Sequence, residues 1–230
     1  LIQIKPVYNY NLNKYNKILF QRNNILKSNK FKDNLEDLLE SFDNQLVKIG
    51  TSIIINRMEY IKLLDKEARD IHKVISSGKE ILKLKYDTNV KVSENKEEIE
   101  YNYMNALKEN LSKDIDYRTT QIGPHRDDMI ININDNSARV FGSQGQQRST
   151  VLSLKLAEVE IIKKQRGSYP VLLLDDVYSE LDMDRRKYLT ELFNNMQTFI
   201  TVSNSESLDS IKYANKTIYN IEDGKIINRR

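Results

Sequence analysis

One short segment constrains the fold more than any other: residues 171–176 read Val-Leu-Leu-Leu-Asp-Asp. A continuous apolar run of this length is typical of a strand in a parallel sheet that helices cover on both faces. In open α/β folds, ligands bind at the carboxyl ends of such strands. The segment therefore predicts an α/β layer with Asp175 and Asp176 at the ligand-binding edge of the sheet.

The neighbouring residues alternate between strand and helix patterns, as a largely parallel sheet requires. The expected elements are strands at 129–134, 138–141 and 198–202, helices at 144–165 and 184–196, and a closing hairpin at 217–227 with its turn at Asp223-Gly224. The first two strands are expected to be joined by a turn at Asp135-Asn136.

The first 110 residues have a different pattern. Apolar residues in 35–53 step by four and three positions, which is a heptad seam, and a second apolar stripe fills 54–75. The sequence Ser76-Ser77-Gly78 then supplies a helix stop. A single strand is expected at 81–86, after these helices. We therefore expect two domains, a helical arm with short coiled-coil-like helices at 1–110 and an α/β domain at 111–230.

Composition excludes several classes of protein. The 230 residues include no cysteine, which rules out a disulfide scaffold, a thiolate zinc site and a cysteine nucleophile. The two histidines, His72 and His125, are too few for a histidine metal cluster, and we expect His125 to be buried or to stabilise a turn. No apolar run approaches the roughly 20 residues of a membrane span. We expect a soluble cytoplasmic protein without a membrane partner.

The net charge of +3 is small, but its distribution is uneven: residues 1–32 hold seven basic residues and no acidic one, with tyrosines between them. A basic stretch with interleaved aromatic residues can follow a phosphate backbone and stack on bases. The candidate DNA contacts are Lys14, Lys17, Arg22 and Lys27. The alternative is a solvated helix face whose acidic partners lie elsewhere in the fold.

The acidic pair after the apolar run is a Walker B pattern. Asp175 is placed to hold Mg²⁺ directly or through water, and Asp176 to orient or deprotonate a water that attacks a γ-phosphate. An acidic pair that caps the next turn is the plainer alternative.

A second candidate site is the sequence Phe-Gly-Ser-Gln-Gly-Gln-Gln-Arg at residues 141–148, directly before a long helix. Ser143 is suited to cap that helix, and Gly145 lets the backbone approach a ligand closely. A hydroxyl, free N–H groups and the helix dipole together form an anion site. A capped helix after a tight turn also explains Ser143, but not the amide side chains that follow.

These features, in this order, resemble the ABC-type ATPase head of SMC and Rad50-like proteins, with the signature motif at 143–146, Walker B at 171–176 and the D-loop at 179–182. The sequences of residues 123–128 (Gly-Pro-His-Arg-Asp-Asp), 141–148 and 172–182 are similar to those of the bacterial RecF family in particular. The resemblance implies an α/β fold, the C-terminal part of an ABC-type ATPase head (a P-loop NTPase), with an inserted α-helical arm or lid domain. The family's P-loop, Gly-x-x-x-x-Gly-Lys-Ser/Thr, is absent from these residues. We therefore interpret the chain as the C-terminal portion of such a protein and expect it to be inactive alone.

The resemblance implies ATP and Mg²⁺ as cofactors and a homodimer that closes when ATP binds. It assigns Asp175 to the metal, Asp176 as the catalytic base, Ser143, Gly145 and Gln146 to the γ-phosphate held by the opposing subunit, and Asp182 to coupling between the two sites.

The function implied is that of a DNA-stimulated ATPase with slow hydrolysis, acting in recombination and repair. Such a protein recognises single-strand gaps and double-strand/single-strand junctions in DNA and promotes RecA loading with RecO and RecR. Two alternatives remain open on the sequence: an SMC-like structural organiser, and a non-catalytic scaffold that binds DNA or protein.

Overall fold

The computed structural model describes residues 1–28, 35–176, 196–203 and 216–229. The chain divides into two compact units, Leu1–Ile161 and Ile162–Arg230. The boundary expected near residue 110 lies inside the first unit. Most of the helix expected at 184–196 and the D-loop with Asp182 lie outside the described residues.

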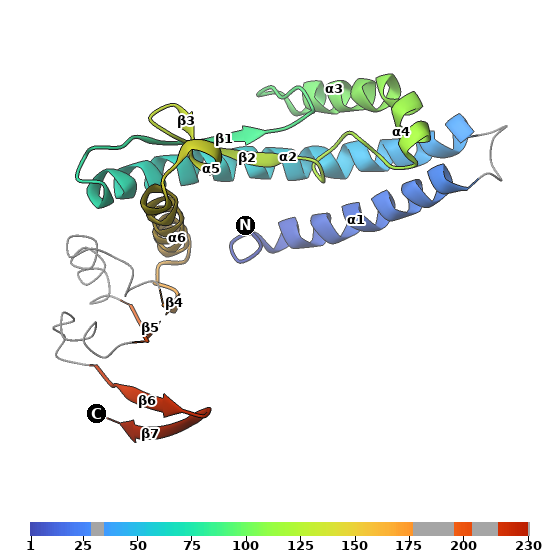
Figure 1. Cartoon of the computed structure of the whole chain (residues 1–230). Helices are drawn as coiled ribbons and strands as arrows, with labels where there is room; N and C mark the ends of the chain where they lie inside the picture. Colours follow the sequence, from blue (N-terminus) through green and yellow to red (C-terminus); the bar gives the residue numbers. More distant parts are fainter. Residues whose placement is uncertain (29–34, 177–195, 204–215, 230) are drawn as a thin grey trace. The chain divides into compact units, whose positions relative to one another are not determined.

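The first unit is built on a long helix, α2 (Leu35–Ile75), with α1 (Pro6–Lys27) packed alongside it (Figure 1). Both apolar stripes expected from the sequence lie on α2, a single helix of 41 residues. The buried residues between α1 and α2 are Tyr8, Tyr15, Ile18, Leu46 and Ile53. The predicted stop is confirmed: the Gly78 amide donates to the Lys73 carbonyl at 2.7 Å, and Gly78 has φ +75°.

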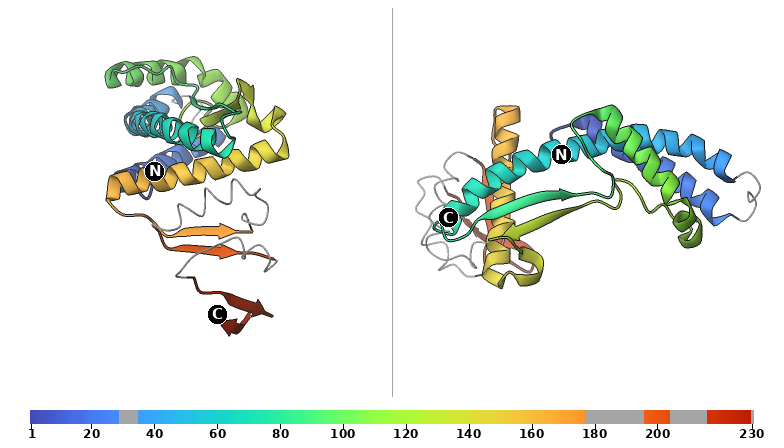
Figure 2. Two further views of the ribbon diagram at one scale, coloured as in Figure 1. Left: turned by 90° about the vertical axis from the view of Figure 1, so that its left-hand side faces the viewer. Right: turned by 90° about the horizontal axis from the view of Figure 1, so that it is seen from above.

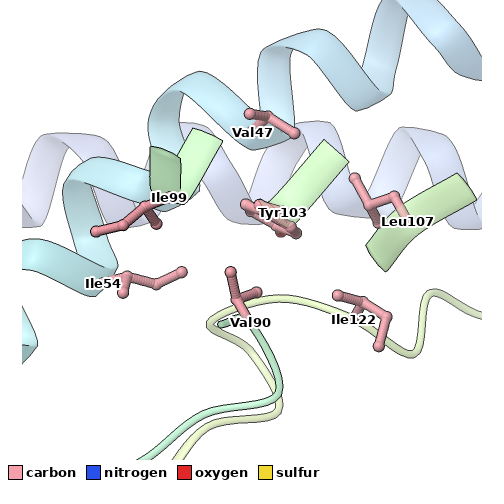
Figure 3. Close-up of a cluster of buried hydrophobic side chains, with 7 residues drawn as sticks. All are labelled: Val47, Ile54, Val90, Ile99, Tyr103, Leu107 and Ile122. Carbon is pink, nitrogen blue, oxygen red and sulfur yellow. The ribbon is translucent and has the colours of Figure 1, made fainter. Parts of the chain in front are cut away.

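A second apolar cluster joins α2 to α3 (Lys96–Glu109) and to two loops (Figure 3). Its buried members are Val47, Ile54, Val90, Ile99, Tyr103, Leu107 and Ile122. Helix α3 begins where the Asn95 side chain accepts hydrogen bonds from the amides of Glu97 and Glu98, a standard N-cap. A short helix, α4 (Leu111–Tyr117), follows it.

His125 connects this core to α1. Its Nε2 atom donates to the Thr120 carbonyl at 2.9 Å, and its Nδ1 atom lies 2.8 Å from the Tyr15 hydroxyl. That hydroxyl lies in turn 2.9 Å from the hydroxyl of Tyr103. The expectation that His125 stabilises a turn is confirmed.

The antiparallel sheet of the first unit runs along α2 (Figure 2) in the order β1 (Leu82–Asp87), β2 (Asp128–Ile133), β3 (Asn136–Ser137). The turn between β2 and β3 consists of Asn134 and Asp135, with φ 49° and 66°, one residue earlier than expected.

The expectation of a return strand at residues 138–141 is wrong, because these residues form the short helix α5 (Ala138–Phe141). The alternation of Ala-Arg-Val-Phe suggested a strand, yet Val140 and Phe141 are both exposed. The Gly142 amide and the Gln147 side chain both donate to the Ala138 carbonyl, at 3.2 Å each. These bonds turn the backbone into α6 (Gln144–Arg166), which has the expected span.

The second unit contains the predicted parallel pair, β4 (Leu172–Asp175) and β5 (Thr198–Thr201). Leu172 and Leu174 are buried, whereas Leu173 is exposed among the described residues. The expected hairpin is present as β6 (Tyr219–Glu222) and β7 (Lys225–Arg229), with Asp223 and Gly224 at positive φ in its turn. Within the described ranges, no helix has the length and apolar character needed to cross a membrane.

Candidate nucleotide and nucleic-acid sites

The first candidate site is the start of α6, residues 143–146, called here the 143–146 segment. The Ser143 hydroxyl accepts from the Gln146 amide at 3.2 Å, while the Gln146 side-chain oxygen accepts from the Ser143 amide at 2.9 Å. This reciprocal pair is a capping box, and it holds the serine at the helix N-terminus. Ser143 and Gly145 are exposed, while the Ser143 and Gln146 amides are bonded within the cap. The arrangement can present the serine hydroxyl and the positive helix end to an anion.

Gly145 leaves open space at this turn. The nearest atom to a Cβ built there is the Ser143 hydroxyl oxygen, at 4.0 Å. Packing within the described chain therefore does not require glycine at this position. The missing side chain instead leaves the helix end accessible to a group from outside.

The Gln146 side chain also contacts Glu80, just after the end of α2. Its Nε2 atom donates to Glu80 Oε1 at 3.0 Å, and Glu80 Oε2 lies 3.0 Å from Nε2 of the fully buried His72. Sequence reasoning missed Glu80 and His72, because nothing in the linear pattern connects the end of α2 with residue 146.

The second candidate site is the carboxyl end of β4, in the second unit. Because β4 and β5 are parallel with Asp175 opposite Thr201, both residues lie at the same edge of the sheet. The Thr201 hydroxyl donates to Asp175 Oδ1 at 2.5 Å and accepts from the Asp176 amide at 3.0 Å. Asp176, which follows β4 directly, has φ 51°, a left-handed backbone conformation.

These oxygen donors are of the kind that Mg²⁺ prefers. The described residues contain no group of three or more acidic, histidine or cysteine side chains that could hold a metal ion. Thr201 was missed by sequence reasoning. Its only signal was a hydroxyl near the end of the strand expected at 198–202.

The expectation that Arg22 contacts DNA is wrong, because Arg22 is buried. Its guanidinium is fully buried and donates to Asp43 at 2.6 Å, to Asp114 at 2.7 Å and to Thr120 at 2.9 Å. Burial raises the pKa of the Asp43 and Asp114 carboxyls, and Arg22 opposes that rise by stabilising their charged forms. The acidic partners that the alternative interpretation required thus exist for Arg22.

The other three candidate DNA contacts, Lys14, Lys17 and Lys27, are exposed on α1. Lys14 lines an open groove of about 430 Å³, called here the lysine groove, whose other lining residues are Asn11, Gln45, Lys48, Ile49, Ser52 and Lys96. Its three cations come from three different helices. Lys96 is paired with Glu100 at 3.3 Å, whereas no ion-pair partner of Lys14 or Lys48 occurs among the described residues. Sequence reasoning missed Lys48 and Lys96, since only folding brings them beside Lys14.

Comparison with known proteins gives a consistent result. No protein-family model matches the chain. It is 44% identical over 226 residues to the DNA replication and repair protein RecF of Clostridium perfringens (strain SM101 / Type A), covering 98% of this chain and 61% of the relative. It is 48% identical over 201 residues to the RecF of Clostridium novyi (strain NT), covering 87% of this chain and 54% of that relative.

Solved structures agree with these relatives. One, described as the recombination mediator protein RecF-ATP in the RecFOR pathway, matches with a TM-score of 0.86 and 38% identity, covering 100% of this chain and 60% of that chain. Another, described as RecF-ATPrS in the same pathway, matches with a TM-score of 0.84 and 38% identity over 97% of this chain and 59% of that chain. The fold is thus that of RecF, an ABC ATPase-type P-loop fold. The chain belongs to the RecF family and spans about three fifths of the length of the relatives it matches.

Proposed function

We propose that this chain is part of an ATP-dependent DNA replication and repair protein that acts as a recombination mediator. The observation that carries the proposal is the capped start of α6, where Ser143 and Gly145 are both exposed. A helix N-terminus of this kind suits a phosphate group. Similarity to structures described as RecF bound to ATP supports ATP as that ligand.

In this proposal the nucleotide site is shared between two copies. Ser143, Gly145 and Gln146 contact the γ-phosphate of an ATP held by the opposing subunit's P-loop. Exposed apolar side chains directly before Ser143, Val140 at 69% and Phe141 at 74%, fit an interface with a second copy. ATP binding would thus close a homodimer.

In this proposal, Asp175 and Asp176 at the carboxyl end of β4 carry out ATP hydrolysis. Asp175 would hold Mg²⁺, which neutralises charge that develops on the phosphate oxygens during transfer. Thr201 orients Asp175 through the bond described above. Asp176 would act as the base that orients and deprotonates the attacking water, with slow turnover, and Asp182 would couple the two sites of the dimer.

The substrate in this proposal is DNA with single-strand gaps or double-strand/single-strand junctions. Exposed Lys14, Lys17 and Lys27 support contact with a phosphate backbone. The partners would be RecO and RecR, and the outcome would be loading of RecA. The names of the similar structures, which place RecF in the RecFOR pathway, support these partners.

DNA-stimulated ATP hydrolysis tests the proposal. We compare the 230-residue chain, an extended protein that adds the P-loop segment of a relative at the N-terminus, and the same extended protein with Asp176→Asn. Turnover only in the extended wild-type protein is expected, because both halves of the composite site and the base are then present. Absence of turnover in every form, together with DNA binding that ignores nucleotide, would contradict it.

A further inference from the structure

A chain of polar side chains joins the 143–146 segment to the end of α2. Starting at the helix cap, the Ser143 amide donates to Gln146, and Gln146 donates to Glu80. Glu80 pairs with His72 at 3.0 Å, and His72 Nδ1 lies 2.9 Å from the Ser153 hydroxyl. We call these five residues the Glu80 relay. All of it lies within the first unit, and the Glu80 side chain is only 18% exposed.

The donors and acceptors of the relay determine one another. The Ser153 hydroxyl donates to the Ser149 carbonyl at 2.7 Å, so it accepts from His72 Nδ1–H. The Gln146 amide has one orientation that serves both neighbours, with its oxygen toward the Ser143 N–H and its NH₂ group toward Glu80. Because each member has its partners, removal of Glu80 leaves the Gln146 NH₂ group and the His72 Nε2 atom without their partner in a poorly hydrated place.

Glu80 also connects the relay to the backbone at the end of α2. Its amide donates to the Ser76 hydroxyl at 3.3 Å, within the turn that ends the helix. The position of the Glu80 carboxylate is therefore set by α2 and by the buried His72. The Glu80 carboxylate in turn fixes the position of the Gln146 side chain, and Gln146 fixes the Ser143 amide of the cap.

We propose that Glu80 and His72 are positioning residues for the 143–146 segment and hold it in the geometry that binds a phosphate of the opposing subunit. This role rests on the proposed function, because it concerns the same composite nucleotide site. Neither residue touches the nucleotide in this proposal. Their effect appears when two copies associate on ATP, and the subunit's own nucleotide binding does not depend on them.

Two substitutions at one position separate positioning from bulk stability. Glu80→Ala removes both acceptor oxygens. Glu80→Gln keeps the shape and permits a complete neutral network: its oxygen accepts from Gln146, its NH₂ donates to His72 Nε2, and His72 Nδ1–H still donates to Ser153.

The measurement is ATP-dependent dimer formation by the extended protein, followed by sedimentation, beside its affinity for ADP. We expect Glu80→Ala to weaken ATP-dependent association about tenfold or more, the size expected when hydrogen bonds to a charged acceptor are lost. Affinity for ADP stays within about twofold, and Glu80→Gln restores association to within about threefold of wild type. A purely structural role would instead lower ADP affinity, dimer formation and thermal stability together.

Asp135→Asn is the matched control. It removes one carboxylate charge from an exposed residue that pairs with Lys83 at 2.6 Å and that lies outside the relay. Its ATP-dependent association should equal that of wild type. Normal dimer formation by Glu80→Ala, or equal loss in Glu80→Ala and Asp135→Asn, would overturn the positioning role.

Amide hydrogen exchange of the 230-residue chain gives a second, nucleotide-free test. The Ser143 and Gln146 amides, both bonded within the cap, should exchange faster in Glu80→Ala than in wild type, while the amides of β1 keep their protection. Unchanged exchange at Ser143 and Gln146 would overturn the inference. If the extended wild-type protein does not dimerise on ATP, the proposed function fails, and the exchange experiment still decides whether Glu80 positions the segment.

Discussion

Arg22 Nη1 lies 2.7 Å from Asp114 Oδ2, and solvent reaches neither side chain. The two residues are 92 positions apart, on α1 and α4. Asp43, on α2, accepts from the same guanidinium at 2.6 Å. One buried cation thus joins three helices of the first unit, and it does so with two carboxylates that would otherwise be left charged in an apolar surrounding.

Arg22→Met should therefore destabilise the chain strongly. Removal of one partner from a buried ion pair costs about 3–5 kcal/mol, because the remaining charges lose their compensation. Denaturant unfolding monitored by circular dichroism measures the change. Lys17→Met, on the exposed face of the same helix, is the control and should stay within about 0.5 kcal/mol of wild type. Similar stability of the two variants would show that the buried cluster contributes nothing to folding.

Gly123→Ala should destabilise for a different reason. Gly123 has φ +131°, and a Cβ there would lie 2.1 Å from the Tyr103 hydroxyl and 2.5 Å from the Tyr15 hydroxyl. Backbone strain and overpacking each contribute about 1–3 kcal/mol, so we expect a loss of about 2–6 kcal/mol. Gly167→Ala serves as the control, because it has φ +76° but nothing within 4 Å of its Cβ, and it should lose only about 1–2 kcal/mol. Thermal unfolding of both variants separates the steric term from the backbone term.

Local pattern was enough to predict the elements whose identity is set by their own residues. The apolar run before Asp175 became β4, its partner β5 lies parallel to it, and α6 begins directly after Ser143 as its cap requires. The stop at Gly78 was predictable for the same reason, since a left-handed residue ends a helix wherever it occurs.

Long-range contacts decided the features that sequence did not predict. Arg22 reads as one more cation in a basic stretch, but its charge is matched by Asp43 and Asp114. Residues 138–141 alternate like a strand, but bonds to the Ala138 carbonyl bend them into a helix. The Thr201 bond to Asp175 joins residues 26 positions apart, and only the register of two parallel strands reveals it.

His125 should make stability depend on pH. Burial lowers its pKa, which the neighbouring guanidinium groups of Arg126, Arg22 and Arg57 lower further, while its bond to the Thr120 carbonyl acts in the opposite direction. In the unfolded chain a histidine takes up a proton near pH 6.5. Between that value and the lower folded pKa, the unfolded state binds more protons, so stability is present above pH 6.5 and falls as pH decreases.

The comparison of wild type with His125→Gln isolates this effect, because the buried carboxyl groups titrate in both proteins. We expect the free energy of unfolding of wild type to fall more steeply than that of His125→Gln between pH 7.5 and pH 5.5. Denaturant melts at four pH values measure the two slopes. Parallel slopes would mean that His125 is protonated as readily in the folded chain as in the unfolded one.

The lysine groove makes a prediction about salt. If Lys14 and Lys48 each neutralise a DNA phosphate, the slope of log K against log salt for duplex DNA should become shallower by about 2 in Lys14→Gln/Lys48→Gln, since each contact contributes about 0.9. The chain's affinity for DNA, measured by fluorescence anisotropy at several salt concentrations, gives that slope.

Lys62→Gln/Lys66→Gln changes the net charge equally at two exposed positions of α2 that do not line the groove, so it is the control. Its slope should match that of wild type. An equal change in both double variants would mean that DNA responds to net charge rather than to the groove. A change confined to the Lys14 and Lys48 variant would place a DNA phosphate in the lysine groove, between α1 and α2. Folding would then have brought together two phosphate-binding lysines that lie 34 positions apart in the sequence.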